Sequence, residues 1–281
     1  MTVAPAPSLV ARGRVLDASR PLVMGIANRT PDSFFDHGSY FAFDRFLAHV
    51  EGLVEAGADI VDIGGVKAGA GPEVSLSEEL DRVVPAVEAV ARRFDVTISV
   101  DTWHSEVLRA SLEAGAHIGN DISGFGDPAY LEVAAAGDAA VVATHIRLAP
   151  RVDDPDPHYD DLVETVVGFL AERAERALAA GLGPSQVILD AGFDLGKTTS
   201  QSLALLAATD RLVELGYPVL VATSNKGFVG ETLGLEVGER REASIAAAAI
   251  AYLRGARLFR MHDVRGARRA LDTLAAISAS A

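Results

Sequence analysis

The chain has 281 residues, of which 49% are hydrophobic and 23% charged, and its formal net charge is −14 at pH 7. A chain of this length buries a large core, and α/β barrels commonly fill it as one domain. The acidic balance disfavours nucleic acid and anionic lipid as partners, because both need a basic protein surface. The absence of cysteine excludes disulfides, thiolate zinc sites and cysteine nucleophiles. We therefore expect a cytoplasmic protein that acts on small molecules.

Residues 1–20 are predicted to form a short flexible N-terminal arm. They begin with a proline- and alanine-rich stretch of little periodicity, and such a segment buries too little surface to become ordered. The charged region and apolar core of a signal peptide are absent, and no apolar run reaches the roughly 18 residues that cross a bilayer. The folded domain is expected to span residues 21–281, with no membrane partner.

Eight short apolar runs follow, with strand character at residues 21–28, 58–65, 96–102, 116–121, 139–145, 186–192, 218–224 and 256–262. Segments long enough for crossover helices lie near residues 42–57, 77–93, 104–115, 128–137, 160–181, 200–215, 239–254 and 263–279. The runs are apolar without strict alternation, as in parallel strands that are covered on both faces. Eight such units predict an α/β fold of the TIM (β/α)8 barrel type. An open α/β sheet is the alternative, although the glycine-rich phosphate loop that usually follows its first strand is absent.

Polar residues stand where these apolar runs end, and a buried strand cannot carry such groups unpaired. In a barrel the carboxyl ends of the strands meet at one mouth, where active sites are built. The residues in question are Asn28, Asp62, Asp101, Asn120, His145, Asp190, Lys226, Arg260 and His262. Nine such groups on one rim are hard to explain by helix capping alone, so we expect a ligand site there.

The residue types at this rim indicate what the ligand is. Two aspartates, an asparagine and a lysine match a planar heterocycle with many donors and acceptors, such as a pterin, since carboxylates accept paired N–H bonds and amides offer both kinds of group. Arg260, His262 and Asn28 offer donors for phosphate oxygens, and Asn28 also offers an oxygen ligand for Mg²⁺.

Several of these groups have simpler alternative roles. Asp101 taken alone would serve equally well as the cap of the next helix, and Asn120 with Asp121 as a turn. His145 and His262 have the alternative of hydrogen-bonded core histidines, which we favour for His145.

The same segments, in the same order, resemble the dihydropteroate synthase family, whose members are barrels that join a dihydropterin diphosphate to 4-aminobenzoate in folate synthesis. The first family signature reads NRTPDSFFDHG from Asn28 to Gly38, and the second begins as DIGG from Asp62 to Gly65. The later matches are ISVDT, IGNDISG, HYDDLV, VILDAGFDLGK, PVLVATSNK and LFRMHDV. The resemblance thus runs over most of the chain and implies a pterin-binding transferase.

The resemblance also implies roles for individual residues. It assigns the pterin pocket to Asp101, Asn120, Asp190 and Lys226, and the diphosphate with Mg²⁺ to Asn28, Arg260 and His262, with Asn28 as the metal ligand. Of these, Asp101, Lys226 and Arg260 are the expected catalytic residues. The loop after Asn28 is expected to close over the reaction, and the protein is expected to be a homodimer.

The 4-aminobenzoate side departs from the family pattern. Where the family has Glu-Ser-Thr-Arg-Pro-Gly, residues 66–71 read VKAGAG, and the Ser-Arg-Lys motif reads SNK at residues 224–226. The candidates on this side are Lys67, Ser224 and Leu195, which replaces the aromatic residue expected to pack on the aminobenzoate ring. Lys67 is interpreted either as a partner for a carboxylate or, as we favour, as a solvated loop lysine. This pattern resembles the divergent second dihydropteroate synthase paralogue of some actinobacteria.

These departures leave more than one function under consideration. The first is a dihydropteroate synthase-type transferase, and the second is a catalytically inactive pterin-binding paralogue with a partner or regulatory role. A corrinoid-dependent methyltransferase domain shares this barrel, but Arg260, Lys226 and the TPDSF loop fit a diphosphate substrate better. The alanine-rich segment 244–256 is interpreted as a subunit interface or, as we favour, as a helix buried against its own barrel.

Overall fold

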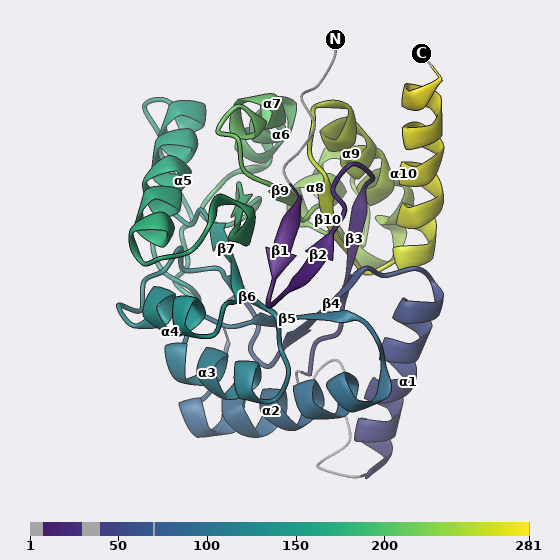
Figure 1. Ribbon diagram of the computed structural model, residues 1–281. Helices are drawn as coiled ribbons and strands as arrows, with labels where there is room; N and C mark the ends of the chain where they lie inside the picture. The colour runs from purple at the N-terminus through teal and green to yellow at the C-terminus, as the bar shows by residue number, and fades with distance from the viewer. Residues whose placement is uncertain (1–7, 30–39, 70, 281) are drawn as a thin grey trace.

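Eight parallel strands, β3 to β10, close into a barrel with helices around its outside (Figure 1). The computed structural model describes residues 8–29, 40–69 and 71–280. Each barrel strand pairs with the next one in the chain, and β10 pairs with β3 to complete the ring. The predicted TIM barrel is therefore confirmed, and the open-sheet alternative is wrong.

The barrel strands are β3 (Leu22–Ile26), β4 (Ile60–Gly64), β5 (Thr97–Asp101), β6 (Ile118–Asp121), β7 (Ala140–Thr144), β8 (Val187–Asp190), β9 (Val219–Val221) and β10 (Leu258–Met261). The α-helices are α1 (Tyr40–Glu55), α2 (Leu76–Arg93), α3 (Ser105–Glu113), α4 (Tyr130–Ala136), α5 (Leu162–Ala179), α6 (Thr199–Ala207), α7 (Thr209–Val213), α8 (Gly227–Leu233), α9 (Arg241–Leu253) and α10 (Val264–Ala279). Two 3₁₀ turns, η1 (Pro184–Gln186) and η2 (Val237–Glu239), complete the set. Within the described residues, no helix combines the length and the apolar character that a membrane crossing requires.

The wall of the barrel separates two apolar clusters. Successive strand residues point to opposite faces, so that Val61 and Ile63 of β4 pack outwards against the helices while Ile60 packs inside the barrel. The interior cluster fills the amino-terminal half of the barrel with Leu22, Met24, Ile60, Ile118, Ala140, Val142, Ile188, Leu220 and Leu258. The next inward positions along the strands are therefore the ones that face the mouth, and there the polar residues begin.

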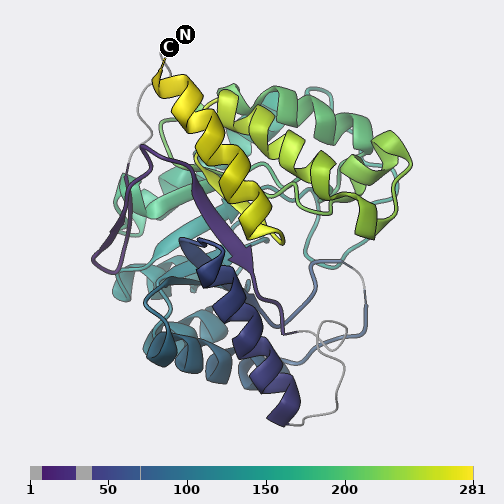
Figure 2. The same ribbon diagram turned by 90° about the vertical axis from the view of Figure 1, so that its right-hand side faces the viewer.

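A hairpin covers the amino-terminal end of the barrel (Figure 2). It consists of β1 (Leu9–Ala11) and β2 (Arg14–Leu16), which pair in antiparallel fashion. Leu9 and Ala11 are fully buried in the interior cluster, and Arg12 donates to two main-chain carbonyls at the end of α3. The expected flexible arm must therefore be corrected for residues 8–20, while residues 1–7 lie outside the described residues. Three-residue strands carry too little periodicity to be recognised from the sequence.

This hairpin gives a direct test of the packing. The replacement Leu9→Ala is expected to lower the free energy of unfolding by about 2–4 kcal/mol, because it leaves a cavity at a fully buried position. Val15→Ala on the same hairpin changes a side chain that is 67% exposed, and its effect should stay within about 0.5 kcal/mol. Urea unfolding of both variants measures the difference. Small effects from both would show that the hairpin does not pack on the barrel.

The alanine-rich segment lies in α9 and packs mainly against its own barrel. Ala248, Ala251 and Tyr252 are buried in the outer cluster, which agrees with the interpretation that we favour. Ile250 and Leu253 on the same helix are 47% and 55% exposed. One face of α9 therefore remains open to solvent.

Candidate active site

Arg260 lies at the centre of a charged cluster at the barrel mouth. Its Nε donates to Asp62 Oδ2 at 2.6 Å and its Nη2 donates to Asp101 Oδ2 at 2.8 Å. Asn120 Nδ2 donates to the same oxygen of Asp62 at 3.2 Å. The Asp62 side chain is fully buried and that of Arg260 is 17% exposed, so these charges depend on one another for compensation. The structure thus brings together residues predicted for the pterin side and for the diphosphate side.

Asp101 belongs to this cluster and does not cap the following helix. The N–H of Ser105 at the start of α3 donates instead to Asp127 Oδ2 at 2.8 Å, so the capping alternative is wrong. Burial raises the pKa of Asp101 to about 7, with Arg260 opposing the shift and the neighbouring carboxylates adding to it. Asp101 therefore titrates near neutral pH, where a change of partner decides its charge.

Asp62 is a site residue whose role the sequence did not reveal. Its Oδ2 accepts two hydrogen bonds, but its buried Oδ1 has no partner among the described residues. A buried carboxylate oxygen without a partner is unfavourable unless a ligand satisfies it. The sequence signal was present, since Asp62 is an inward-facing polar residue in the middle of the buried strand β4, but its partners lie far away in the chain.

Asn28 follows β3 and lies beside Asp101. A Cβ added to Gly64 would be 3.0 Å from Asn28 Oδ1 and 3.3 Å from Asp101 Cβ, so both side chains line one short stretch of the rim. Within the described residues there is no group of three or more His, Asp or Glu that would hold a metal ion. One amide oxygen fits Mg²⁺ only if phosphate oxygens and water supply the other ligands, which is a common arrangement for this ion. The predicted closing loop at residues 30–39 lies outside the described residues.

Asp190 and Lys226 form the other side of the rim. Asp190 ends β8, is 6% exposed and accepts a hydrogen bond from the Gly192 N–H at 2.8 Å. Burial raises the pKa of Asp190. Lys226 Nζ donates to the Phe193 carbonyl at 3.0 Å, and burial lowers its pKa against the opposing effect of Asp194 and Asp190. A buried carboxylate at the end of β8 and a half-buried ammonium group after β9 therefore lie on this side of the rim.

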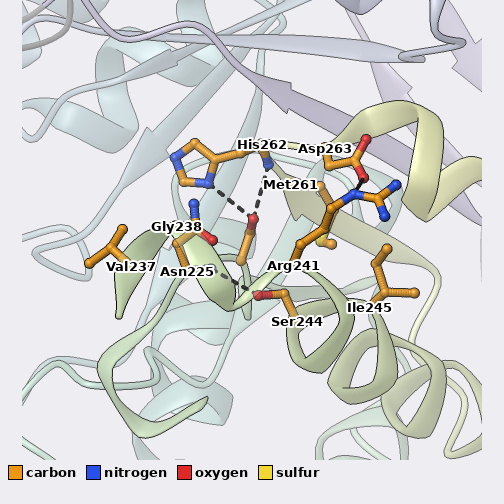
Figure 3. A pocket seen from close by; sticks show the side chains of 10 residues that line it. Asn225, Val237, Gly238, Arg241, Ser244, Ile245, Met261, His262 and Asp263 are labelled. Carbon is orange, nitrogen blue, oxygen red and sulfur yellow. Dashed lines mark hydrogen bonds and ion pairs between the residues drawn. The ribbon is translucent and has the colours of Figure 1, made fainter. Parts of the chain in front are cut away.

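Ser224 and His262 line a pocket of about 400 Å³ (Figure 3). The His262 N–H donates to Ser224 Oγ at 3.1 Å, and this hydroxyl lies 3.0 Å from His262 Nδ1. In the tautomer in which the hydroxyl donates to Nδ1, the neutral ring carries its hydrogen on Nε2, which is then a donor for an anion. Partial loss of hydration and the charge of Arg260 lower the pKa of His262, although its side chain is still exposed. Arg241 lines the same pocket and pairs with Asp263.

The other residues predicted for the aminobenzoate side lie on two loops. Lys67 is exposed on the loop after β4. Arg151 holds this loop, because its N–H donates to the Ala68 carbonyl at 3.2 Å and its guanidinium donates to the Pro72 carbonyl. Leu195 is half-buried on the loop after β8.

The loop after β8 also carries the carboxylate of Asp194. Asp194 adopts a positive φ of 66°. Its Oδ2 accepts the Gly227 N–H at 2.5 Å, and its Oδ1 accepts the Phe228 N–H at 3.3 Å. A negative charge therefore lies directly beside the Ser224–Lys226 segment.

His145 has the surroundings of a core histidine, as we favoured. It is 3% exposed, its Nδ1 lies 2.9 Å from Lys197 Nζ, and its ring meets Phe169 edge-on at 4.9 Å between centroids. The turn alternative applies to Asp121 alone, whose carboxylate accepts two main-chain N–H groups. Asn120 instead points into the charged cluster.

Comparison with known proteins identifies the family. The family model described as "Pterin binding enzyme" matches residues 24–262. The chain belongs to the pterin-binding enzyme family. This assignment agrees with the rim of carboxylates, amide and lysine that the structure assembles at the barrel mouth.

Relatives within the pterin-binding family carry two kinds of name. The chain is 44% identical over 271 residues to "Inactive dihydropteroate synthase 2" of Mycobacterium leprae, covering 94% of this chain and 93% of that protein. It is 42% identical over 258 residues to "Dihydropteroate synthase" of Escherichia coli strain K12, covering 92% of each. The predicted resemblance to dihydropteroate synthases, including the divergent second paralogue, is therefore confirmed.

Solved structures from the same family share the whole fold. A dihydropteroate synthase of Xanthomonas albilineans with 4-aminobenzoic acid superposes with a TM-score of 0.91 at 41% identity, covering 98% of this chain and 99% of that one. The enzyme from the same organism in complex with 7,8-dihydropteroate has a TM-score of 0.87 at 40% identity, with coverage of 97% and 99%. The architecture is thus that of structures solved with an amine-side ligand and with a pteroate.

Proposed function

We propose that this chain is a dihydropteroate synthase-type transferase that condenses dihydropterin diphosphate with 4-aminobenzoate. The observation that carries the proposal is the buried cluster of Arg260, Asp62, Asp101 and Asn120, in which Asp62 Oδ1 lacks a partner. A ring rich in N–H groups would satisfy this oxygen, and the arginine would bind an attached diphosphate. The names of the E. coli and X. albilineans relatives support the same reaction.

The chemistry follows from how these side chains would exchange partners. When the ring donates its N–H groups to Asp62 and Asp101, it replaces the guanidinium on these carboxylates. Arg260 is then released toward the diphosphate, where it stabilises the charge that develops as the carbon–oxygen bond breaks. The aniline nitrogen is neutral at pH 7, so it forms the new carbon–nitrogen bond without a strong base and gives its proton to solvent or to the departing diphosphate.

The other rim residues would position the two reactants. Asp190, Asn120 and Lys226 would hold the ring, while the Nε2–H of His262 would donate to a phosphate oxygen. Asn28 would hold Mg²⁺ together with the diphosphate, and the ion when bound supplies positive charge to the leaving group. Positioning of this kind accounts for much of the rate in reactions of a weak nucleophile.

A second candidate function is a non-catalytic pterin-binding paralogue with a partner or regulatory role. It is favoured by the changed amine side, where Asn225 stands in place of the family arginine and the Asp194 carboxylate accepts the Gly227 N–H directly after the Ser224–Lys226 segment. An acid substrate approaching this segment would meet added negative charge and one guanidinium fewer. The name of the M. leprae relative points the same way.

A diphosphate-release assay separates the two functions. The full chain is incubated with dihydropterin diphosphate and Mg²⁺, with and without 4-aminobenzoate, and free diphosphate is followed over time. The transferase predicts release that depends on 4-aminobenzoate and formation of the pteroate product. Binding of the diphosphate without such release would contradict the transferase and support the non-catalytic paralogue.

We also propose that the protein is a cytoplasmic homodimer. Exposed apolar side chains gather on helices that contact one another, namely α6, α8, α9 and α10. They are Leu203, Leu233, Ile250, Leu253 and Ile277, each between 39% and 62% exposed. Such an accumulation is typical of an interface. Sedimentation of the full chain and of Ile250→Lys tests this, since the dimer predicts dissociation of the variant and a monomeric parent would contradict it.

A further inference from the structure

Thr144 carries a buried hydroxyl that no other described residue hydrogen-bonds. It is the last residue of β7 and is 2% exposed, and its Oγ1 has no hydrogen-bond partner among the described residues. Removing a hydroxyl from water without a partner is unfavourable, so such a group calls for an explanation. A ligand that enters the mouth is one explanation with testable consequences.

The backbone directs Thr144 into the barrel. Val142 two residues earlier packs in the interior cluster, while Val141 and Ala143 pack outwards against the helices, and side chains alternate along a strand. Thr144 therefore points inwards at the carboxyl end of β7. Its register partner on β8 is Asp190, a residue predicted to bind the pterin.

The methyl group of Thr144 is directed toward the loop after β8, and a ligand would have to meet the hydroxyl on the side away from that loop. A Cβ added to Gly192 would lie 3.1 Å from Thr144 Cγ2, so the methyl group is turned to the loop after β8. Thr144 and Asp190 lie at the same level of the barrel, because they are register partners on adjacent strands. A ring that reaches Asp190 would therefore also reach the level of Thr144.

We propose that Thr144 is a further specificity-determining residue, whose hydroxyl donates a hydrogen bond to the ring carbonyl oxygen of a bound pterin. The proposal rests on the proposed pterin site. The Asp190 carboxylate accepts N–H groups, and on a 2-amino-4-oxo ring the carbonyl oxygen follows directly after the N–H groups along the same edge. A carboxylate and a hydroxyl side by side therefore match this alternation of donors and acceptor.

The test compares side chains that differ only in the hydroxyl. Thr144→Val keeps the shape without the hydroxyl, Thr144→Ser keeps the hydroxyl without the methyl group, and Thr144→Ala lacks both. The measurement is calorimetric titration of each full chain with dihydropterin, together with its thermal unfolding without ligand. Thr144→Val and Thr144→Ala are expected to bind about 5- to 10-fold more weakly than the parent, and Thr144→Ser within about 3-fold of it.

The unfolding temperature of the ligand-free chain is the second measurement. If the Thr144 hydroxyl had only a structural role, its removal would lower this temperature. Loss of an unpartnered hydroxyl should raise the unfolding temperature of Thr144→Val by about 2 °C or more, even though binding weakens. Ser111→Ala on α3 is the matched control, because Ser111 Oγ is also buried without a partner but lies on a helix outside the barrel wall. It should leave dihydropterin affinity unchanged.

The outcomes separate this inference from the function on which it rests. Parental affinity in Thr144→Val, or equal losses in Thr144→Ser and Thr144→Ala, would overturn the role of the hydroxyl while leaving the pterin site intact. If the parent chain bound no dihydropterin, the proposed site would fail and the role of Thr144 with it. Should Thr144→Val not fold, the comparison of Thr144→Ser with Thr144→Ala decides alone.

Discussion

The replacement Arg260→Ala is expected to lower the affinity for dihydropterin diphosphate by about 100-fold, while free dihydropterin loses far less. The guanidinium is the cation nearest to the two rim carboxylates, and a diphosphate would recruit it through charge-assisted hydrogen bonds. Free dihydropterin has no anion to place there. The difference between the affinity losses for the two ligands should therefore come from the diphosphate.

The same replacement also tests the ion pairs in the unliganded protein. Without Arg260, Asp62 and Asp101 would be left buried without a counter-charge, and breaking a buried pair in this way destabilises a protein by about 3–5 kcal/mol. Protonation of Asp101, whose pKa already stands at about 7, would relieve part of this loss.

Arg254→Ala is a suitable control, since Arg254 pairs with Asp210 at an exposed position. Calorimetric titration with both ligands gives the comparison, and equal losses for the two would contradict the diphosphate role.

The replacement Asp101→Asn is expected to weaken dihydropterin binding by about 10-fold or more, because an amide offers one acceptor oxygen in place of two. The variant keeps the shape of the side chain and removes its charge. Asp95→Asn, at a side chain that is 93% exposed before β5, is the control and should bind as the parent does. Unchanged affinity in Asp101→Asn would remove this residue from the site.

The pH dependence of the parent follows from the raised pKa of Asp101. When the pH is below the Asp101 pKa of about 7, the carboxyl group is protonated and cannot accept paired N–H groups. Dihydropterin affinity should therefore rise between pH 6 and pH 8. The stability of the fold should change with pH in the opposite direction. The pKa of Asp101 is near 4 in the unfolded chain and about 7 in the folded one, so its contribution to stability is fully present below pH 4 and is lost as the pH rises through about 7. Asp101→Asn should show neither trend, and a parallel pH profile for parent and variant would assign the titration to another group.

The strands and the position of the mouth were predictable from the sequence because both depend on local pattern. Each apolar run is bounded by polar residues, and closure of eight such runs brings Asn28, Asp101, Asn120 and Asp190 to one rim. What local pattern does not contain is the pairing across the barrel. Arg260 bonds to carboxylates 159 and 198 residues earlier in the chain, so its engagement by Asp101 and Asp62 is visible only in three dimensions.

The same reason explains which residues the sequence left without a role. Asp62 and Thr144 have unpartnered buried atoms, a property that depends on the absence of neighbours rather than on residue type. Leu9 becomes a core residue because the barrel end that it covers is assembled from distant strands. Composition alone therefore predicted a flexible arm where the fold provides a surface to pack on.

We propose that one mouth binds a pterin and an attached diphosphate together, with Arg260 passing from the carboxylates to the diphosphate. Calorimetric titration of the full chain, in Mg²⁺, with dihydropterin diphosphate, free dihydropterin and inorganic diphosphate in turn tests this arrangement. We expect dihydropterin diphosphate to bind far more tightly than either free dihydropterin or inorganic diphosphate. Failure of dihydropterin diphosphate to bind, or binding no tighter than that of inorganic diphosphate, would contradict this arrangement.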